Sequence, residues 1–327
     1  MAQARMAWMD ELRGLAIVLV VLFHAQTVDE RFVPEMPDAV WTTMALFAPF
    51  RMPLLMFLSG MLLARSLSKP TPVFFAGKLR AIAWPYLLWS LVFLAVSAQL
   101  TVGNVLAVAY LPPTYLWFLW FLLAYYVAAW LMRLWRIPAW VGLAVGVLGA
   151  FGPDAFRFSR FCFLFVFFLA GDLYVRHRDR LALDARRRWL VPAAALVAVA
   201  GAVASGLGVE VQYSPLFLAA PLAAVVLAVV VLPTVRLGRV GAALAYVGRD
   251  SLVFYVTHFT VLWACAWDLR AAGVTNGWVV YGVTVVVALG VGLALTWARH
   301  RSLLVDALFR LPGRPARVPA AVPAGVS

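Results

Sequence analysis

Apolar runs of about 20 residues alternate with short charged or proline-containing stretches along almost the whole chain. A helix needs about 20 apolar residues to cross the hydrocarbon core of a bilayer, so this pattern predicts an all-α polytopic membrane protein with about ten transmembrane helices. The expected spans are residues 12–28, 43–65, 80–99, 115–134, 137–152, 158–175, 189–206, 215–235, 247–268 and 276–298.

The composition excludes a soluble domain. Hydrophobic residues make up 65% of the 327-residue chain and the mean hydropathy is +0.93, more apolar surface than a soluble domain of this size could bury. We expect one membrane domain over residues 1–310 and a disordered cytoplasmic tail over 311–327, which is rich in Pro, Ala and Val. The first apolar run lacks a small-residue cleavage site, so we expect it to be retained.

The distribution of charge predicts the orientation. Of the 27 Lys and Arg residues, all but Arg31, Arg51, Arg157, Arg160 and Arg270 fall on one side of the expected spans. The positive-inside rule then places both termini in the cytoplasm, as expected for a multi-pass protein of the inner (plasma) membrane. The net charge of +13 is therefore mostly topological, and no nucleic-acid-binding motif accompanies it.

The first expected span carries three ionisable residues: Asp10, Arg13 and His24. Eleven helical steps of about 100° come close to three full turns, so Arg13 and His24 share a face, about 16 Å apart along the axis. Asp10 precedes Arg13 at the i,i+3 distance of a salt bridge. A neutral imidazole is suited to take a proton from an attacking hydroxyl, although a buried histidine can also simply tie two helices together.

Two further stretches could hold a ligand near the cytoplasmic side. Ser59-Gly60 in the second span either allows another helix to approach closely or leaves room for a bound chain. Lys78 and Arg80 precede Pro85, which is expected to kink the third span. Their charges either follow from the positive-inside rule or bind phosphates.

Aromatic and polar residues mark two later spans. Trp117 belongs to an aromatic cluster at the start of the fourth span, which is either an interfacial belt or a wall for stacking a sugar. Ser251, Tyr255 and His258 form one polar stripe on the ninth span, which either lines a cavity or bonds neighbouring helices. Cys162 and Cys265 lie in apolar runs and are interpreted as packed thiols; no metal-ligand spacing occurs in the sequence.

In residues 9–258 the chain resembles acyltransferase family 3, a family of integral membrane acyltransferases. Four stretches carry the resemblance, in the same order as in the family: Asp10-x-x-Arg13-Gly14 with His24, Met52-Pro53 to Ser59-Gly60, Leu116-Trp117-Phe118-Leu119, and Gly248-Arg249-Asp250-Ser251 through Tyr255 to His258. One departure is that the family often has a basic pair spaced Arg-x-x-Arg before the proline of the third span, whereas this chain has Lys78-x-Arg80.

The resemblance implies a catalytic role for His24, with Arg13 as its partner in the donor site and Trp117 lining the same cavity. Family members move an acyl group, often acetyl from acetyl-CoA, to extracytoplasmic glycans, lipids or small molecules. Applied to this chain, it implies an O-acetyltransferase of the cell envelope, embedded in membrane lipid and without a bound cofactor.

The working hypothesis combines the residues with the resemblance. Cytoplasmic acyl-CoA is the co-substrate, bound near Arg13, Lys78, Arg80 and Ser59, and a glycan, lipid or small molecule accepts the acyl group at a hydroxyl. Asp10 belongs to the catalytic set with His24, which acts as a general base or carries the acyl group covalently. The alternative is a glycan or lipid transporter, but the repeated Gly/Pro-broken helices typical of transporters are missing from the sequence.

Overall fold

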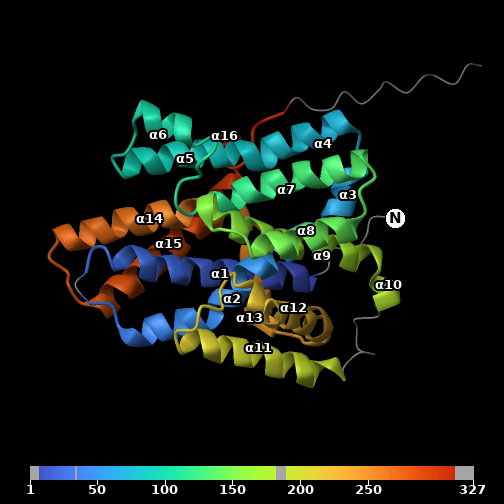
Figure 1. The fold of residues 1–327 in the computed structure, drawn as a ribbon. Helices are drawn as coiled ribbons and strands as arrows, with labels where there is room; N and C mark the ends of the chain where they lie inside the picture. Colours follow the sequence, from blue (N-terminus) through green and yellow to red (C-terminus); the bar gives the residue numbers. More distant parts are fainter. Residues whose placement is uncertain (1–6, 34, 182–188, 314–327) are drawn as a thin grey trace, which may run out of the picture.

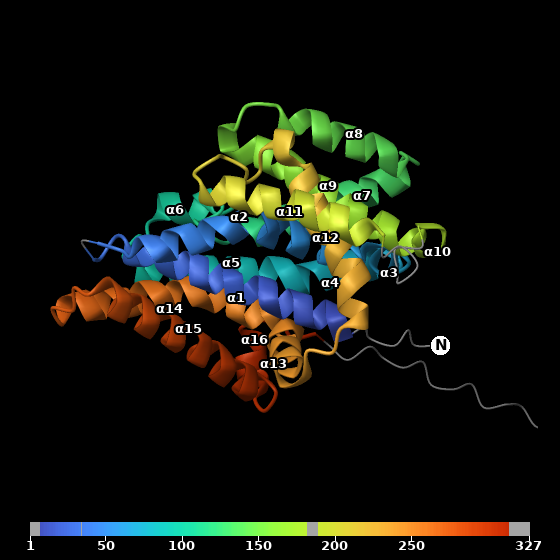
Figure 2. The same cartoon turned by 90° about the horizontal axis from the view of Figure 1, so that it is seen from below.

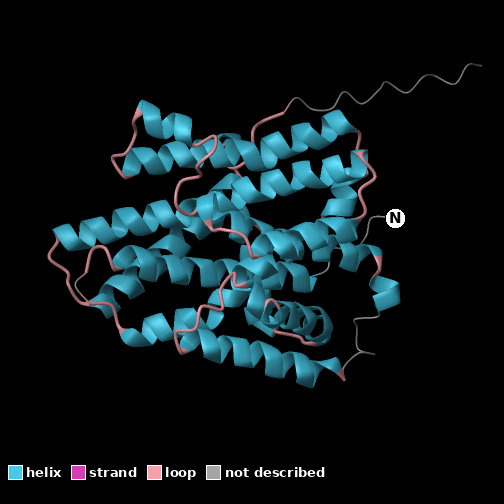
Figure 3. Cartoon of the chain, in the orientation of Figure 1, coloured by secondary structure: helices cyan, strands magenta, loops and turns pink. Residues whose placement is uncertain are grey.

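The computed structural model describes residues 7–33, 35–181 and 189–313, and this part of the chain consists of helices and turns without a strand (Figure 1, Figure 3). The helices are α1 (Ala7–Asp29), α2 (Asp38–Gly60), α3 (Leu63–Leu67), α4 (Thr71–Lys78), α5 (Trp84–Val96), α6 (Val102–Ala107), α7 (Trp117–Leu134), α8 (Ala139–Ala150), α9 (Phe158–Arg176), α10 (Arg178–Leu181), α11 (Leu190–Gly206), α12 (Ala219–Val231), α13 (Gly238–Arg249), α14 (Ser251–Ala271), α15 (Gly277–Arg299) and α16 (Leu303–Ala307). A π-helical turn, Leu79–Ala83, joins α4 to α5, and 3₁₀ turns occupy Ala155–Arg157, Pro215–Phe217 and Leu232–Thr234.

The all-α membrane fold expected from the sequence is confirmed. Within the described residues, eight helical stretches are long and apolar enough to cross a membrane. The expected fifth and seventh spans correspond to the shorter helices α8 and α11, and α8, at 12 residues, rises only about 18 Å against a core of about 30 Å. The eighth corresponds to α12, which crosses its neighbours steeply and is seen almost end-on in Figure 1 but lengthwise in Figure 2. The count of ten spans and the cytoplasmic termini therefore stay predictions.

Helix α1 occupies the middle of the molecule. It contacts α2, α13, α14 and α15 (Figure 2). Its buried residues face several directions rather than one stripe. A helix that is apolar nearly all round is one that packs inside a larger structure. The polar residues of α1 are therefore held among other helices.

Glycine fixes where α1 and α13 cross. A Cβ atom on Gly14 would collide with the backbone carbonyl of Leu244, and one on Gly248 would collide with the carbonyl of Asp10. Two of the sequence motifs, around Arg13-Gly14 and Gly248-Arg249, thus meet backbone to backbone. This contact sets the position of Arg13 at the start of α1.

A second glycine contact joins α2 and α9. A Cβ atom on Gly60 would meet the carbonyl oxygen of Phe168, and one on Gly171 would meet that of Phe57. The helix-packing interpretation of Gly60 is therefore confirmed. The Ser59 hydroxyl donates to the Leu55 carbonyl of its own helix at 2.7 Å.

Substituting Gly60 with Ala should destabilise the protein by about 1–3 kcal/mol, because the added methyl group forces α2 away from α9. The matched control is Gly282→Ala in α15, where nothing lies within 4 Å of the added carbon and helix propensity improves. Thermal unfolding in detergent checks this: G60A should melt several degrees below the wild type and G282A at or slightly above it. Equal melting temperatures for the two variants would contradict the packing described here.

Candidate active site

Two histidines from distant parts of the chain meet between α1 and α14. Nε2 of His258 lies 3.1 Å from Nδ1 of His24, although the residues are 234 positions apart. His258 is fully buried and packs edge-on to the Tyr115 ring, whereas His24 is only half-buried. The structure therefore joins a fully enclosed imidazole to that of a residue with partial exposure.

The hydrogen-bond partners define the tautomers of both rings in their neutral form. Nδ1 of His258 lies 2.7 Å from the Tyr255 carbonyl and 3.1 Å from the Phe254 carbonyl, which can only accept. Nδ1 of His258 must therefore carry the proton, and its Nε2 is an acceptor. Nδ1 of His24 then donates, either to that nitrogen or to the Val20 carbonyl at 3.0 Å.

This arrangement leaves Nε2 of His24 as a base. Since the single ring proton sits on Nδ1, Nε2 has a lone pair, and no hydrogen bond to it is found within the described residues. A nitrogen of this kind can take a proton from a hydroxyl, and His258 can accept from the imidazolium that forms.

Arg13 lies at one end of α1 beside a cavity of about 200 Å³, here called the Arg13 cavity. The expected salt bridge from Arg13 to buried Asp10 is confirmed, at 3.9 Å. Besides Arg13, the cavity is lined by Ile17, Leu55, Ser59, Leu62, Ala81, Ile82, Phe118, Leu119, Leu122, Tyr126, Ser251, Leu252 and Tyr255. Four residues expected at the site therefore share one hollow: Arg13, Ser59, Ser251 and Tyr255.

The two basic residues before Pro85 have different surroundings. Lys78 lies 3.2 Å from the ring centre of Tyr126, which lines the Arg13 cavity, and it donates to the Ser66 hydroxyl at 3.0 Å. Arg80 instead donates to the carbonyl of Leu311 at 2.9 Å. Leu311 opens the expected disordered tail; residues 314–327 of that tail lie outside the described residues. The π-helical turn at 79–83, just before Pro85, separates the surroundings of Lys78 from those of Arg80.

A larger hollow of about 620 Å³, here called the Tyr213 pocket, lies farther along α1. It is lined by Phe23, Gln26, Trp41, Ala45, Ala48, Asp154, Ser159, Arg160, Ser205, Val209, Glu210, Val211, Gln212, Tyr213, Ser214 and Pro215. Trp117 lies behind this wall, with the Arg160 guanidinium 5.5 Å from its ring centre. The order along α1 is therefore Arg13 and Ile17 at one hollow, Phe23 and Gln26 at the other, and His24 beside Phe23.

Arg51 is a residue that the sequence interpretation missed. We expected it among the outer charges, but it lies near the middle of the helical stretch Asp38–Leu67 and is 3% exposed. Its guanidinium carbon sits 3.6 Å from the ring centre of Phe23, next to His24. The signal was available: an arginine between Pro49 and Pro53 inside an apolar run is costly in a membrane and usually marks a functional site.

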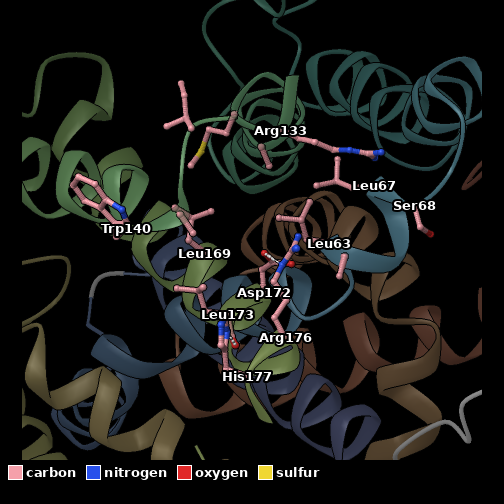
Figure 4. A pocket seen from close by; sticks show the side chains of 15 residues that line it. Leu63, Leu67, Ser68, Arg133, Trp140, Leu169, Asp172, Leu173, Arg176 and His177 are labelled. Atoms are coloured by element: carbon pink, nitrogen blue, oxygen red, sulfur yellow. Dashed lines mark hydrogen bonds and ion pairs between the residues drawn. The ribbon is translucent and has the colours of Figure 1, made fainter. Parts of the chain in front are cut away.

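A third hollow, of about 630 Å³, lies among α3, α7, α8 and α9 (Figure 4). Asp172 and Arg176 form an ion pair in it at 2.6 Å, with His177 nearby. Neither α1 nor α14 contributes to its wall, and none of the expected site residues lines it. It is therefore separate from the histidine pair.

Comparison with known proteins gives the family. The family model of acyltransferase family 3, described as an acyltransferase domain, matches residues 6–297, nearly the whole chain. This chain belongs to that family and is a membrane acyltransferase. No curated protein and no solved structure matches it.

The tautomers can be measured directly, because the chain has only four histidines. With ¹⁵N-labelled histidine at pH 8, NMR should find His24 and His258 both protonated at Nδ1. The variants His24→Gln and His258→Gln assign the signals, because each variant lacks the signals of the histidine that was replaced. A proton on Nε2 of His24 would contradict the basic nitrogen described above.

Proposed function

We propose that the protein transfers an acyl group, most simply acetyl, from acyl-CoA in the Arg13 cavity to a hydroxyl of an acceptor in the Tyr213 pocket. The observation that carries this proposal is the position of His24. It lies on α1 between residues that line the two hollows, and its Nε2 is a base. A base at the position of His24 is useful only if the ligands of the two hollows react with each other there.

The Arg13 cavity has the features of a donor site. Arg13 and, behind Tyr126, Lys78 supply positive charge for the phosphates of CoA. The remaining lining is mostly apolar, which suits the extended pantetheine arm and its thioester. The rise from Arg13 to His24 is about 16 Å, a distance that this arm can span.

The transfer itself needs one proton to move twice. Nε2 of His24 takes the proton of the acceptor hydroxyl while the oxygen of that hydroxyl attacks the thioester carbon. The tetrahedral intermediate then loses the carbon–sulfur bond, and the CoA thiolate takes the proton back from His24. The products are an acyl ester and free CoA, so no further reactant is required.

His258 acts in this scheme as a positioning residue. Its unprotonated Nε2 accepts from Nδ1 of His24, which holds the ring orientation and stabilises the imidazolium formed during attack. Its own Nδ1 is fixed by the Tyr255 and Phe254 carbonyls.

The cellular setting follows from the charge distribution. Positive charge gathers around the Arg13 side, so we infer that acyl-CoA enters from the cytoplasm across the inner membrane. The Tyr213 pocket then faces outward, where a cell-envelope glycan or lipid would arrive. Asp10 supports the donor site by holding Arg13.

His24→Ala should lower the transfer rate by about 10²–10⁴-fold, the usual contribution of a general base, without changing the amount of folded protein. His258→Gln should keep part of this rate, because the amide oxygen can still accept from Nδ1 of His24, whereas His258→Ala removes the acceptor and should lose more. The assay is release of free CoA thiol in proteoliposomes with an envelope glycan extract. Wild-type rates in well-folded His24→Ala would contradict the base assignment.

Arg13→Ala should weaken acyl-CoA binding by about tenfold or more, since a charge-assisted hydrogen bond is lost. Arg13→Lys should recover part of this, because the charge survives without the planar fork. Titration of purified protein with acyl-CoA measures it, with the exposed Arg65→Ala as the matched control. If Arg13→Ala binds acyl-CoA as Arg65→Ala does, the donor does not contact Arg13.

A further inference from the structure

Three arginines lie at or close to the Tyr213 pocket: Arg160 lines it, Arg51 packs on the lining residue Phe23, and Arg157 belongs to the turn just before α9. Each has a buried nitrogen that the described part of the chain leaves without a hydrogen-bond partner. These atoms are Nη1 of Arg51, Nη1 of Arg157 and Nε of Arg160. A buried donor of a charged group that makes no hydrogen bond costs about 1–3 kcal/mol or more. Three such donors in one place indicate a missing acceptor.

The three arginines all act electrostatically on the phenol of Tyr213. Burial raises the pKa of the Tyr213 phenol, which lies outside the membrane-spanning helices. The cations that oppose this shift by direct electrostatic interaction are Arg160, Arg51 and Arg157. The three arginines come from different parts of the chain: Arg51 from α2, Arg160 from α9 and Arg157 from the turn that precedes α9.

Aromatic contacts do not satisfy these arginines. Arg51 stacks on Phe23 at 3.6 Å, and Arg160 lies 4.5 Å from the Tyr213 ring centre. Such contacts use the flat face of the guanidinium, whereas its N–H groups lie in the plane and point along the edges. Nη1 of Arg51 and Nε of Arg160 are therefore still available to bind a planar or tetrahedral oxyanion.

The backbone before α9 is strained in a way that orients Arg157. Phe156 and Arg157 have φ angles of 52° and 62°, in the left-handed region that residues other than glycine rarely adopt. Two such residues in succession cost free energy, and strain of this kind is found mainly at functional sites. Phe156 is 85% exposed while Arg157 turns inward, so the strain places the cation.

The remaining lining is suited to a sugar. Trp41, Phe23 and Tyr213 offer aromatic surfaces, and Gln26 and Ser205 offer short polar groups. The carboxylates at the pocket are those of the exposed residues Asp154 and Glu210, and Asp154 acts electrostatically on Arg157. Two carboxylates do not balance the three arginines, so a net positive charge remains.

We propose that the acceptor bound in the Tyr213 pocket is an acidic sugar, whose phosphate or carboxylate is held by Arg51, Arg157 and Arg160. Calling the bound sugar the acceptor rests on the proposed function, whereas binding of the sugar in the pocket does not depend on acyl transfer. Held in this way, the sugar would present a hydroxyl toward His24, beside Phe23.

The test is binding by the full chain in lipid nanodiscs, without acyl-CoA, measured by ligand-observed NMR. The probes are glucose 6-phosphate, glucuronate, neutral glucose and inorganic phosphate. At least one acidic sugar should bind about tenfold or more tightly than glucose and than inorganic phosphate. The better of the two acidic sugars identifies the oxyanion.

Variants assign that binding to the arginines. Arg160→Gln and Arg157→Gln should each weaken binding of the acidic sugar about tenfold. Arg270→Gln, an exposed arginine of α14 outside the pocket, should not change it. Arg157→Lys keeps the charge and should recover part of the loss, which separates an effect on binding from misfolding.

Equal binding of glucose and both acidic sugars, or no effect of Arg157 and Arg160 substitutions, would overturn the proposal. Inorganic phosphate binding as tightly as the sugar phosphate would overturn the sugar assignment. These outcomes are separate from the proposed function. Acyl transfer to neutral acceptors alone would refute only this inference, and acidic-sugar binding without any transfer would refute only the acyltransfer scheme.

Discussion

The hydrogen bond between His24 and His258 is the interaction on which the rest of the site depends. Each imidazole in a membrane interior needs a partner, because an unsatisfied polar group there is costly. The Tyr255 and Phe254 carbonyls fix the proton on His258, which then fixes the proton on His24. A chain of hydrogen bonds that starts at the α14 backbone therefore ends in one basic nitrogen on α1.

Nε2 of His24 can act as a base only because the neighbouring helices hold α1 in a fixed position. The glycine contacts of α1 with α13 bring the backbones together at Gly14 and Gly248, next to Arg13. Because α1 is a rigid helix fixed at this point, its side chains occupy fixed positions along the helix axis. Arg13 then lines one hollow and Phe23 the other, and the ring centre of His24 lies 5.2 Å from that of Phe23. Sites built on rigid helices hold reacting groups more accurately than sites built on loops.

Helix-level features were predictable from the sequence, and contacts between helices were not. The periodicity of the sequence predicts that one helix carries Asp10, Arg13 and His24. It also predicts the salt bridge between Asp10 and Arg13. The meeting of His24 with His258 depends on how α1 and α14 pack, and no spacing rule reaches across 234 residues. The contact of Arg80 with Leu311 depends in the same way on where the segment after α16 lies.

Arg51 was missed for a different reason. Counting it as a loop charge satisfied the positive-inside rule, so its place between two prolines in an apolar run received no weight. The helix α12 shows the limit of hydropathy itself, since an apolar run of sufficient length predicts a helix but not its tilt (Figures 1 and 2). Burial and direction are set by neighbouring helices, which a single sequence does not reveal.

In the proposed reaction His24 takes the proton of a hydroxyl that arrives from one side of the membrane, and that hydroxyl attacks an acyl thioester that arrives from the other side. The most direct measurement uses sealed vesicles with the protein in one orientation, radiolabelled acetyl-CoA in one compartment and acceptor glycan in the other. Labelled product should appear in the acceptor compartment only when acetyl-CoA is supplied on the side of Arg13, and His24→Ala vesicles should give none. Product formed only on the same side as acetyl-CoA would contradict the account.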